Sequence, residues 1–205
     1  MLVDSLNKYN QEMLPATNLA LRMLHERRDL FCMLDCEGVP DELELLQLYL
    51  PAIDPTRVFL VDCRRLVPLP SELQELLISP RICKVVHDVH CDAHAMYHKL
   101  GLTLSNVFDT QLAYERLCGE LHIGFGKLLE IYQCPPHPLK KAMQDRMDKD
   151  PSLWNRRPLP SDVLAYAAFD VTRLAVKRKK RKEKKEKRKE TKKKKKEEEE
   201  ESKNM

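Results

Sequence analysis

The sequence predicts an α/β domain built on a mixed β-sheet with helices on both faces. Three short apolar runs follow one another closely between residues 30 and 63, and strand-like and helix-like segments alternate after residue 68. The helix-like segments repeat their apolar residues every three or four positions. Short connections favour antiparallel pairing of the first three strands, and the later alternation favours parallel strands joined by right-handed crossovers.

The first half of the chain predicts one helical segment and three strands. Residues 1–29 are helix-like, with Thr17 as the expected N-cap of a leucine-rich helix. The nearly continuous apolar run FCMLDC, which begins at residue 31, is typical of a central strand. LELLQLYL, from residue 43, fits a strand or a helix, because periodicity alone does not separate the two. VFLVDC, from residue 58, predicts the third strand.

The second half predicts alternating strands and helices, closed by a helix that contains the sequence YAAFD. Gly101 and Gly119 are expected to end two of the helices, Ser71 is the expected N-cap of another, and Asp109 is expected to cap the helix after it. The expected strands are 82–88 and 106–110, and the expected helices are 68–79, 91–101, 110–119, 126–133, 140–150 and 158–174.

Charge divides the chain into two unequal parts. Residues 177–205 hold 17 Lys/Arg and 8 Glu, and have no apolar residue before Met205, which predicts a Lys/Glu-rich tail that cannot bury a core. The preceding 176 residues carry 19 basic and 24 acidic side chains. We therefore predict an N-terminal helical segment at 1–29, a main domain at 30–176 and a charged tail at 177–205. The basic tail would allow nuclear import.

Cysteine usage and hydropathy indicate an intracellular protein. The chain has seven cysteines, an odd number without a CxxC pair, as expected for reduced thiols. No segment approaches the ~20 apolar residues of a membrane span, and the first thirty residues lack the apolar core of a secretory signal. We expect a soluble protein in the cytoplasm or the nucleus, with no membrane partner.

Four acidic residues from three distant segments suggest one site. Asp35 and Glu37 lie two residues apart on a strand, so their side chains share a face. Asp92 follows the strand at 82–88, where an acid also suits the first turn of a helix. Asp170 lies in the middle of a helix, where neither capping nor the dipole explains it, and Tyr166 shares its face. Oxygen-rich clusters of this kind suit Mg²⁺ or Mn²⁺.

The order LDCEG, HDVHCDAH and YAAFD resembles the three motifs of the tyrosine-bearing DEDDy branch of 3′–5′ exonucleases. This branch of the ribonuclease H-like superfamily includes RNase D and the proofreading domains of DNA polymerases. The flanking sequence WNRRPLPSDVLAYAAFDVTRL is also similar to the family, and the resemblance covers about residues 30 to 175. The chain is most similar to exonuclease-domain proteins of the Egalitarian and piRNA-biogenesis type. A ribonuclease H-like fold, with the exonuclease domain at 30–176, is what the resemblance implies.

The resemblance also implies a role for each site residue. Asp35 would bridge two divalent cations, Mg²⁺ or Mn²⁺; Glu37 and Asp170 would help hold the first, Asp92 would hold the second, and Tyr166 would orient the attacking water. The implied reaction is two-metal-ion hydrolysis at the 3′ end of single-stranded nucleic acid, RNA in preference to DNA, with release of nucleoside 5′-monophosphates. Protein partners in RNA processing are a further expectation from this branch.

Three other interpretations compete with catalysis. The same branch implies catalytically inactive exonuclease-fold adaptors that bind RNA in RNA-processing or piRNA-type complexes, and the charged tail would also suit a structural scaffold. The third interpretation is a zinc site formed by the histidines of HDVHCDAHAMYH. His90 and His98, however, are separated by about 12 Å of helix rise, too far to share one ion. The residues considered for zinc are His87, His90, Cys91, His94 and His98.

Overall fold

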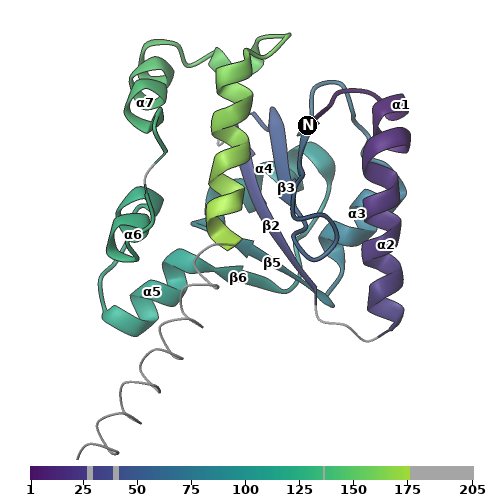
Figure 1. Cartoon of the computed structure of the whole chain (residues 1–205), viewed down its shortest axis with the longest axis horizontal. Helices are drawn as coiled ribbons and strands as arrows, with labels where there is room; N and C mark the ends of the chain where they lie inside the picture. The colour runs from purple at the N-terminus through teal and green to yellow at the C-terminus, as the bar shows by residue number, and fades with distance from the viewer. Residues whose placement is uncertain (27–29, 39–41, 136, 176–205) are drawn as a thin grey trace, which may run out of the picture.

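A six-stranded mixed sheet forms the centre of the molecule (Figure 1), with strand order β1-β4-β3-β2-β5-β6. The structure is a computed structural model that describes residues 1–26, 30–38, 42–135 and 137–175. The strands are β1 (Leu2–Val3), β2 (Leu30–Glu37), β3 (Leu45–Tyr49), β4 (Val58–Asp62), β5 (Ile82–Val86) and β6 (Val107–Asp109).

Strand pairing confirms the predicted mixed sheet. β2, β3 and β4 form an antiparallel meander, which resolves LELLQLYL as a strand. β5 pairs parallel with β2, and β6 pairs parallel with β5. The sequence did not predict β1, which pairs parallel with β4, because two residues are too few to show a pattern.

Helices connect and cover the strands. In chain order they are α1 (Leu6–Lys8), the π-helical turn η1 (Tyr9–Met13), α2 (Leu14–His25), α3 (Ser71–Ile78), α4 (Val89–Leu100), α5 (Thr110–Cys118), α6 (Phe125–Ile131), α7 (Lys140–Lys149), the 3₁₀ turn η2 (Leu153–Asn155) and the helix of residues 161–175, called here the C-terminal helix. Gly101 and Gly119 end α4 and α5 in the left-handed conformation, as predicted, because glycine adopts a positive φ without strain.

Two predicted helix caps are wrong. Thr17 lies inside α2, where its hydroxyl donates to the carbonyl of Met13, because the helical path already begins at Leu6 with Ser5 as its cap. The π-helical turn before α2 allows the path to continue past Pro15. Ser71 is the first residue of α3 rather than its cap, and the N-cap is Pro70.

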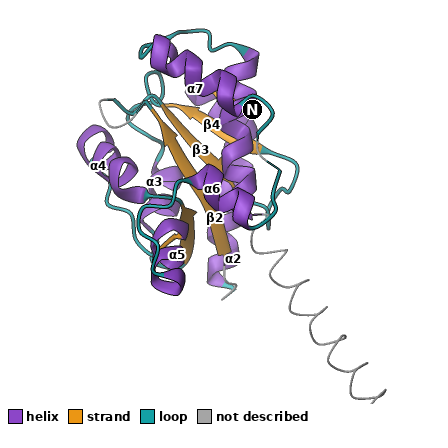
Figure 2. Ribbon diagram, turned by 90° about the vertical axis from the view of Figure 1, so that its left-hand side faces the viewer, coloured by secondary structure: helices purple, strands orange, loops and turns teal. Residues whose placement is uncertain are grey.

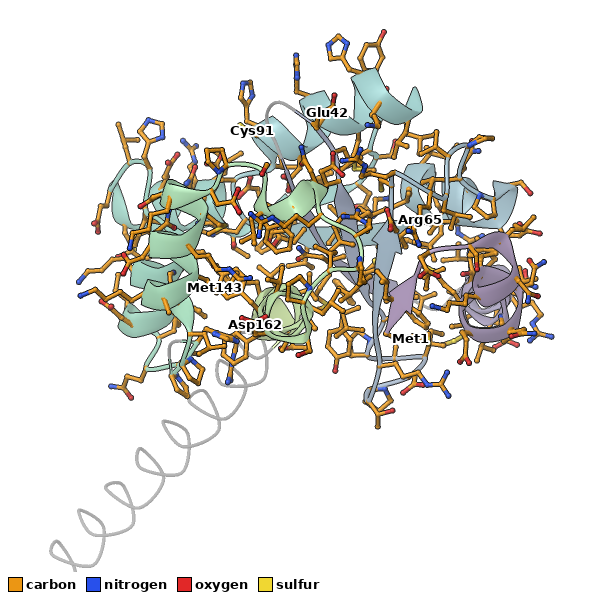
Figure 3. The ribbon with its side chains drawn as sticks, turned by 90° about the horizontal axis from the view of Figure 1, so that it is seen from above. Met1, Glu42, Arg65, Cys91, Met143 and Asp162 are labelled. Atoms are coloured by element: carbon orange, nitrogen blue, oxygen red, sulfur yellow. The ribbon has the colours of Figure 1, made fainter. Side chains whose placement is uncertain are left out.

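The two faces of the sheet carry different helices (Figures 1 and 2). The larger hydrophobic core lies on the face covered by α2, α3 and α4. On the opposite face the C-terminal helix packs on β2, β3 and β4, and α7 lies beside it. Figure 3 shows this neighbour relation, with Met143 marking α7 and Asp162 marking the start of the C-terminal helix. Arg146 donates to Asp162 at 2.7 Å and joins the two helices.

β2 changes character along its length, and this change positions the site. One set of alternating side chains points into the core under α2, namely Cys32, Leu34 and Cys36. On the other face, Phe31 and Met33 pack near Val171 and Leu174 of the C-terminal helix. Side chains alternate along a strand, so Asp35 and Glu37 continue this second row beneath the same helix. An apolar row therefore becomes acidic at the end of the strand.

The expectations for the charged tail, for membrane spans and for the cysteines have different outcomes. The predicted charged tail at 177–205 lies outside the described residues, and the division of the chain into segments stays a prediction. No helix in the described part of the chain has the length and hydropathy needed to cross a membrane. The seven cysteines are free thiols, of which four are buried.

Candidate active site

Three of the predicted acids meet at the end of β2. Asp35 and Glu37 project from the strand, and Asp170 comes from the C-terminal helix that packs over it. One carboxylate oxygen of each lies within 4.8 Å of the other two, a spacing at which the three could share one cation. They border a pocket of ≈ 190 Å³ lined by Asp35, Cys36, Glu37, His87, Phe125, Tyr166, Asp170 and Leu174.

Burial raises the pKa values of the three acids, and repulsion between them adds to the increase for Asp35 and Glu37. Burial, followed by the charge of Asp170, raises the pKa of Asp35 to about 7. Burial and the charges of Asp35 and Asp170 also raise the pKa of Glu37 well above its ordinary value. Burial raises the pKa of Asp170 to about 6, although Lys140 and Tyr166 oppose this change. Each of the three residues is half-buried.

The donor set fits divalent cations. Within the described ranges, none of the acids Asp35, Glu37, Asp92 and Asp170 forms an ion pair with a basic side chain. Buried carboxylates that repel one another are costly unless a cation neutralises them. Carboxylate oxygens are hard ligands that suit Mg²⁺ and Mn²⁺.

Asp92 lies next to this cluster rather than inside the group of three. It occupies the first turn of α4 and is 5% exposed. Burial and the charge of Asp35, with smaller contributions from Asp88 and Asp109, raise its pKa to about 9. The structure thus places all four predicted acids in one electrostatic neighbourhood, with Asp92 as its more distant member.

Asp109 orients the helix that carries Asp92. Its carboxylate accepts hydrogen bonds from the backbone N–H groups of Asp88 and Val89, at 3.1 and 2.9 Å, just before and at the start of α4. It also accepts from the N–H of Gln111 at 2.8 Å and caps α5, as predicted from the sequence. One buried acid therefore fixes two helix starts beside the site.

Tyr166 lies one helical turn before Asp170 and is buried. Its hydroxyl lies close enough to the Asp170 carboxylate to interact with it, and burial together with the charge of Asp170 raises the pKa of the phenol far above its ordinary value. The phenol therefore stays protonated and acts as a hydrogen-bond donor. The ring of His137 packs edge-on against Tyr166, with 5.1 Å between centroids, and supports its orientation.

The histidines considered for zinc do not converge. His90, His94 and His98 are exposed on α4, and the rings of His94 and His98 lie 4.3 Å apart, centroid to centroid. His87 instead lines the acidic pocket, where its Nε2 lies 3.0 Å from the carbonyl oxygen of Ile123. Across the part of the chain that the structure describes, only Asp35, Glu37 and Asp170 form a group of three or more His, Cys, Asp or Glu with metal-binding spacing.

Two residues near the acids were not singled out from the sequence. Lys140, at the start of α7, lowers the pKa of Asp170, and a side chain at Gly126 would collide with its Nζ. It belongs to a polar helix that gives no sequence signal. Gln47 is fully buried on β3 directly opposite Asp35. A lone amide within the apolar run LLQLYL was a signal that could have identified it.

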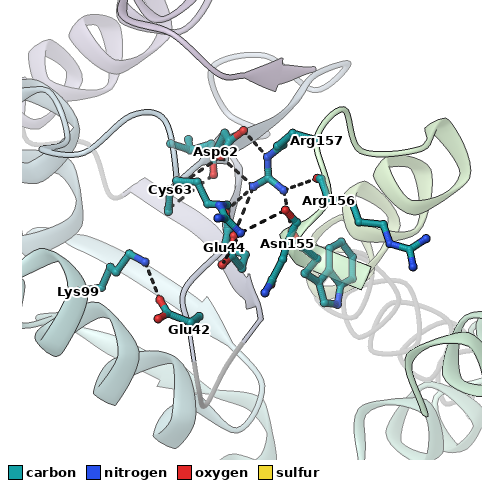
Figure 4. A network of polar contacts seen from close by, with 11 residues as sticks. Glu42, Glu44, Asp62, Cys63, Lys99, Asn155, Arg156 and Arg157 are labelled. Atoms are coloured by element: carbon teal, nitrogen blue, oxygen red, sulfur yellow. Dashed lines mark hydrogen bonds and ion pairs between the residues drawn. The ribbon is translucent and has the colours of Figure 1, made fainter. Parts of the chain in front are cut away.

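An ion pair anchors the segment that leads into the C-terminal helix (Figure 4). Arg157 donates to both carboxylate oxygens of Asp62 at the end of β4, at 2.5 and 2.8 Å. The same guanidinium donates to the backbone carbonyls of Trp154 and Glu44, at 2.6 and 3.2 Å. These bonds tie residues 154–157 to the meander and so fix where the helix with Tyr166 and Asp170 starts.

Comparison with known proteins places the chain in a family. A family model described as "3'-5' exonuclease" matches residues 34–179, which include all five predicted site residues. The chain belongs to this 3′–5′ exonuclease family. Among curated members, "piRNA biogenesis protein EXD1" of Mus musculus is 28% identical over 165 residues, covering 74% of this chain and 29% of that protein. "Ribonuclease D" of Bartonella henselae is 28% identical over 181 residues, covering 83% of this chain and 41% of that protein.

Solved exonuclease structures share the fold. The Trypanosoma brucei RNase D structure with GMP superposes with a TM-score of 0.70 at 25% identity, covering 86% of this chain and 55% of that one. Escherichia coli RNase D, at 23% identity, superposes with a TM-score of 0.63. The mixed sheet and its flanking helices are thus those of RNase D-like exonucleases. The chain spans less than half the length of the two curated relatives it matches above.

Proposed function

We propose that this chain is a 3′–5′ exoribonuclease that hydrolyses phosphodiester bonds with the help of two divalent cations, Mg²⁺ or Mn²⁺. The observation that carries the proposal is the meeting of Asp35, Glu37 and Asp170, whose oxygens lie within 4.8 Å of one another without an ion-pair partner in the described chain. Membership of the exonuclease family supports it independently.

Each site residue has a role in this proposal. Asp35, Glu37 and Asp170 would hold one cation, and Asp35 and Asp92 would hold the second. When bound, such cations lower the pKa of a coordinated water and neutralise charge on the departing oxygen. Tyr166, protonated and next to Asp170, would orient the attacking water. This arrangement leaves the protein mainly with positioning and charge compensation, the usual sources of acceleration in phosphoryl transfer.

Lys140 and the pocket would hold the end of the substrate. The ammonium group of Lys140 is close enough to Asp170 to lower the pKa of that acid, and we propose that it attracts the scissile phosphate. Phe125 lines the pocket, and nucleobases stack on aromatic side chains. A pocket of ≈ 190 Å³ suits one terminal nucleotide unit rather than a duplex.

RNA is the proposed substrate class because relatives are named ribonuclease D, exosome complex component 10 and piRNA biogenesis protein. We propose single-stranded RNA, with DNA as the weaker substrate, release of nucleoside 5′-monophosphates, protein partners in RNA processing and an intracellular location. The roles proposed for the five site residues involve no 2′-hydroxyl, so we propose that a preference for ribose comes from other residues around the pocket.

Single-stranded RNA labelled at its 5′ end tests the proposal directly. With Mg²⁺ or Mn²⁺, the wild type should shorten the labelled strand stepwise from its 3′ end and release nucleoside 5′-monophosphates. Asp35→Asn should bind the strand and leave it intact, and DNA of the same sequence measures the preference for ribose. Binding by the wild type without mononucleotide release, in either cation, would contradict the exonuclease and favour an RNA-binding adaptor.

A further inference from the structure

Gln47 occupies a position that its own environment does not explain. It is 0% exposed at the middle of β3. Neither its Oε1 nor its Nε2 makes a hydrogen bond of normal geometry with any described residue. Buried amides are almost always hydrogen-bonded, because a donor or acceptor removed from water without a partner is costly. An unpaired glutamine in the centre of a sheet therefore needs a reason.

Strand register gives the direction in which this amide has polar neighbours. Gln47 pairs with Asp35 on β2 and with Leu60 on β4. Directly opposed residues share a face, and residues two positions apart on one strand do so as well. On this face Gln47 is therefore bounded by Leu45, Tyr49 and Leu60 on three sides and by Asp35 on the fourth. Within the sheet, the register therefore places the polar partners available to this amide on β2.

Glu37 is the acid that Gln47 reaches. It lies diagonally across from Gln47 in the β2–β3 pair, a position that long side chains can span. Burial and the charges of Asp35 and Asp170 raise the pKa of Glu37, and hydrogen bonding from Gln47 opposes that effect. The two groups are thus close enough to interact, although no hydrogen bond of normal geometry joins them in the described chain.

On the basis of the proposed two-cation function, we propose that Gln47 is a positioning residue that donates a hydrogen bond from Nε2 to the Glu37 carboxylate and holds it in its metal-binding orientation. One carboxylate oxygen is then occupied by the amide, and the other is left for the cation. Carboxylates that bind metals are generally held by such outer hydrogen bonds, and their loss lowers metal affinity or activity.

A neutral amide is the suitable donor at this position. A lysine or arginine would form an ion pair with Glu37 and neutralise the charge that attracts the cation. A glutamine donates through two N–H groups without adding charge. It orients the ligand and keeps the cluster negative, so the amide stabilises the loaded site while it remains poorly satisfied in the metal-free chain.

Gln47→Met and Gln47→Leu test the proposal on the full chain, because both replace the amide with an apolar side chain, and methionine also keeps the length of glutamine. Gln74→Leu is the matched control: Gln74 is a half-buried glutamine on α3 that donates to the carbonyl of Leu69 at 2.6 Å. Binding of Mn²⁺ is measured by titration calorimetry without RNA. The Mn²⁺ concentration that gives half-maximal mononucleotide release is measured separately.

Both Gln47 variants should bind Mn²⁺ about 10–100-fold more weakly than the wild type. The Mn²⁺ concentration for half-maximal turnover should rise by the same factor, while turnover at saturating Mn²⁺ is largely retained. Gln74→Leu should keep the affinity of the wild type. A purely structural role for Gln47 would instead lower the melting temperature in both variants and leave Mn²⁺ affinity unchanged.

Unchanged Mn²⁺ affinity in either folded Gln47 variant overturns the proposal, as does a wild type that binds no Mn²⁺ at this site. Weakened binding in both variants together with no mononucleotide release by the wild type supports the role of Gln47 and removes the exonuclease function. Mononucleotide release that is equal in the wild type and the variants at every Mn²⁺ concentration leaves the exonuclease in place and removes the role of Gln47.

Discussion

Acidic side chains at the ends of two strands of the same sheet, β4 and β2, have opposite electrostatic surroundings. At the end of β4, Asp62 is 0% exposed and accepts two hydrogen bonds from Arg157. At the end of β2, Asp35 and Glu37 face Asp170 instead of a base. The first group is neutralised within the chain, whereas the second is left with mutual repulsion.

Burial alone does not distinguish the two groups. It raises the pKa of Asp62, but the hydrogen bonds and charge of Arg157 outweigh it and bring the pKa below its ordinary value. Burial also raises the pKa of Asp35, and the charge of Asp170 adds to that increase, to about 7. The difference lies in the partner. An acid paired by the chain holds the fold together, and an unpaired acidic cluster is available to a cation from solution.

The largest expected effect is at the unpaired cluster. Asp35→Asn keeps the size of the side chain and removes its charge, so turnover should fall by ~10³-fold, as for loss of a group that stabilises the transition state. The melting temperature of the metal-free protein should stay equal or rise, because one repelled buried carboxyl is removed. Mononucleotide release measures the turnover, and thermal unfolding measures the melting temperature.

Asp145→Asn, at an exposed acid of α7, is the control for this change and should alter neither quantity. If Asp35→Asn lowers the metal-free melting temperature as much as a broken ion pair would, Asp35 has a partner within the chain, and the contrast between the two acidic groups fails.

The paired group should show the reverse behaviour. Arg157→Met leaves Asp62 buried without a cation, which should cost ~3–5 kcal/mol of unfolding free energy. The loss should be the same with and without Mn²⁺ and is measured by urea denaturation. The neighbouring Arg156→Met is the control, because the Arg156 side chain is 57% exposed and its ion pair with Asp150 should contribute less than ~1 kcal/mol. Equal losses in the two variants would contradict the account.

Tyr166→Phe separates orientation from metal binding. The phenol lies beside Asp170 and stays protonated, so loss of its hydroxyl should misplace the attacking water and lower turnover by about 10²-fold. The affinity for Mn²⁺ should be retained, since no carboxylate is removed. Tyr97→Phe, at an exposed tyrosine of α4, should leave turnover unchanged. Turnover equal to the wild type in Tyr166→Phe would exclude an orienting role for the phenol.

The pH dependence of stability should reveal the unpaired cluster. The pKa values of Asp170, Asp35 and Asp92 are raised to about 6, 7 and 9 in the folded chain. At these pH values the unfolded acids have already lost their protons, so the folded state binds more protons than the unfolded state. The stabilising contribution of these acids is therefore complete below pH ~4, and it is lost progressively as pH rises from about 4 to about 9.

Melting temperatures of the metal-free chain across this pH range measure the effect. They should fall as pH rises, and saturating Mn²⁺ should remove or reverse the fall, because cation binding releases the same protons. Asp35→Asn should flatten the metal-free curve. A metal-free wild type whose stability rises from pH 6 to 9 would show that the acids are already compensated.

The smallest expected effect is at an exposed ion pair. Lys99 donates to Glu42 at 2.7 Å, with side chains that are 33% and 56% exposed. Solvent screening limits such pairs, so Lys99→Ala should change the unfolding free energy by less than ~1 kcal/mol. Urea denaturation of Lys99→Ala and Arg157→Met, compared side by side, shows how strongly burial increases the contribution of an ion pair to the unfolding free energy. A loss similar to that of Arg157→Met would mean that exposure does not weaken this pair.

The sequence predicted the acidic residues of the site, but it did not predict the buried ion pair between Arg157 and Asp62. Alternation along β2 and the four-residue spacing in YAAFD depend only on local geometry. The sequence could therefore place Asp35 and Glu37 on one face of a strand, and Asp170 on the helix face that carries Tyr166. Arg157 and Asp62 are 95 residues apart, and nothing local relates them. The sequence contained both charges but no information on their distance.

The fold shows the same division between local and distant effects. Five of the six strands have a readable apolar run or a position in the alternation, while β1 consists of two residues that are ordered by pairing with β4. Thr17 looked like a cap because cap residues are common at such positions, but a helical path that starts at Leu6 overrides this preference. The role proposed for Gln47 could not be predicted from the sequence, because it depends on the register of β3 against β2.

Anomalous diffraction from crystals grown with Mn²⁺ tests the central claim most directly, because it locates the cations without any assumption about activity. The account predicts two peaks ~4 Å apart, both within coordination distance of Asp35, with Glu37 and Asp170 on one and Asp92 near the other. Crystals with Mn²⁺ in excess that show no peak between β2 and the C-terminal helix would contradict it.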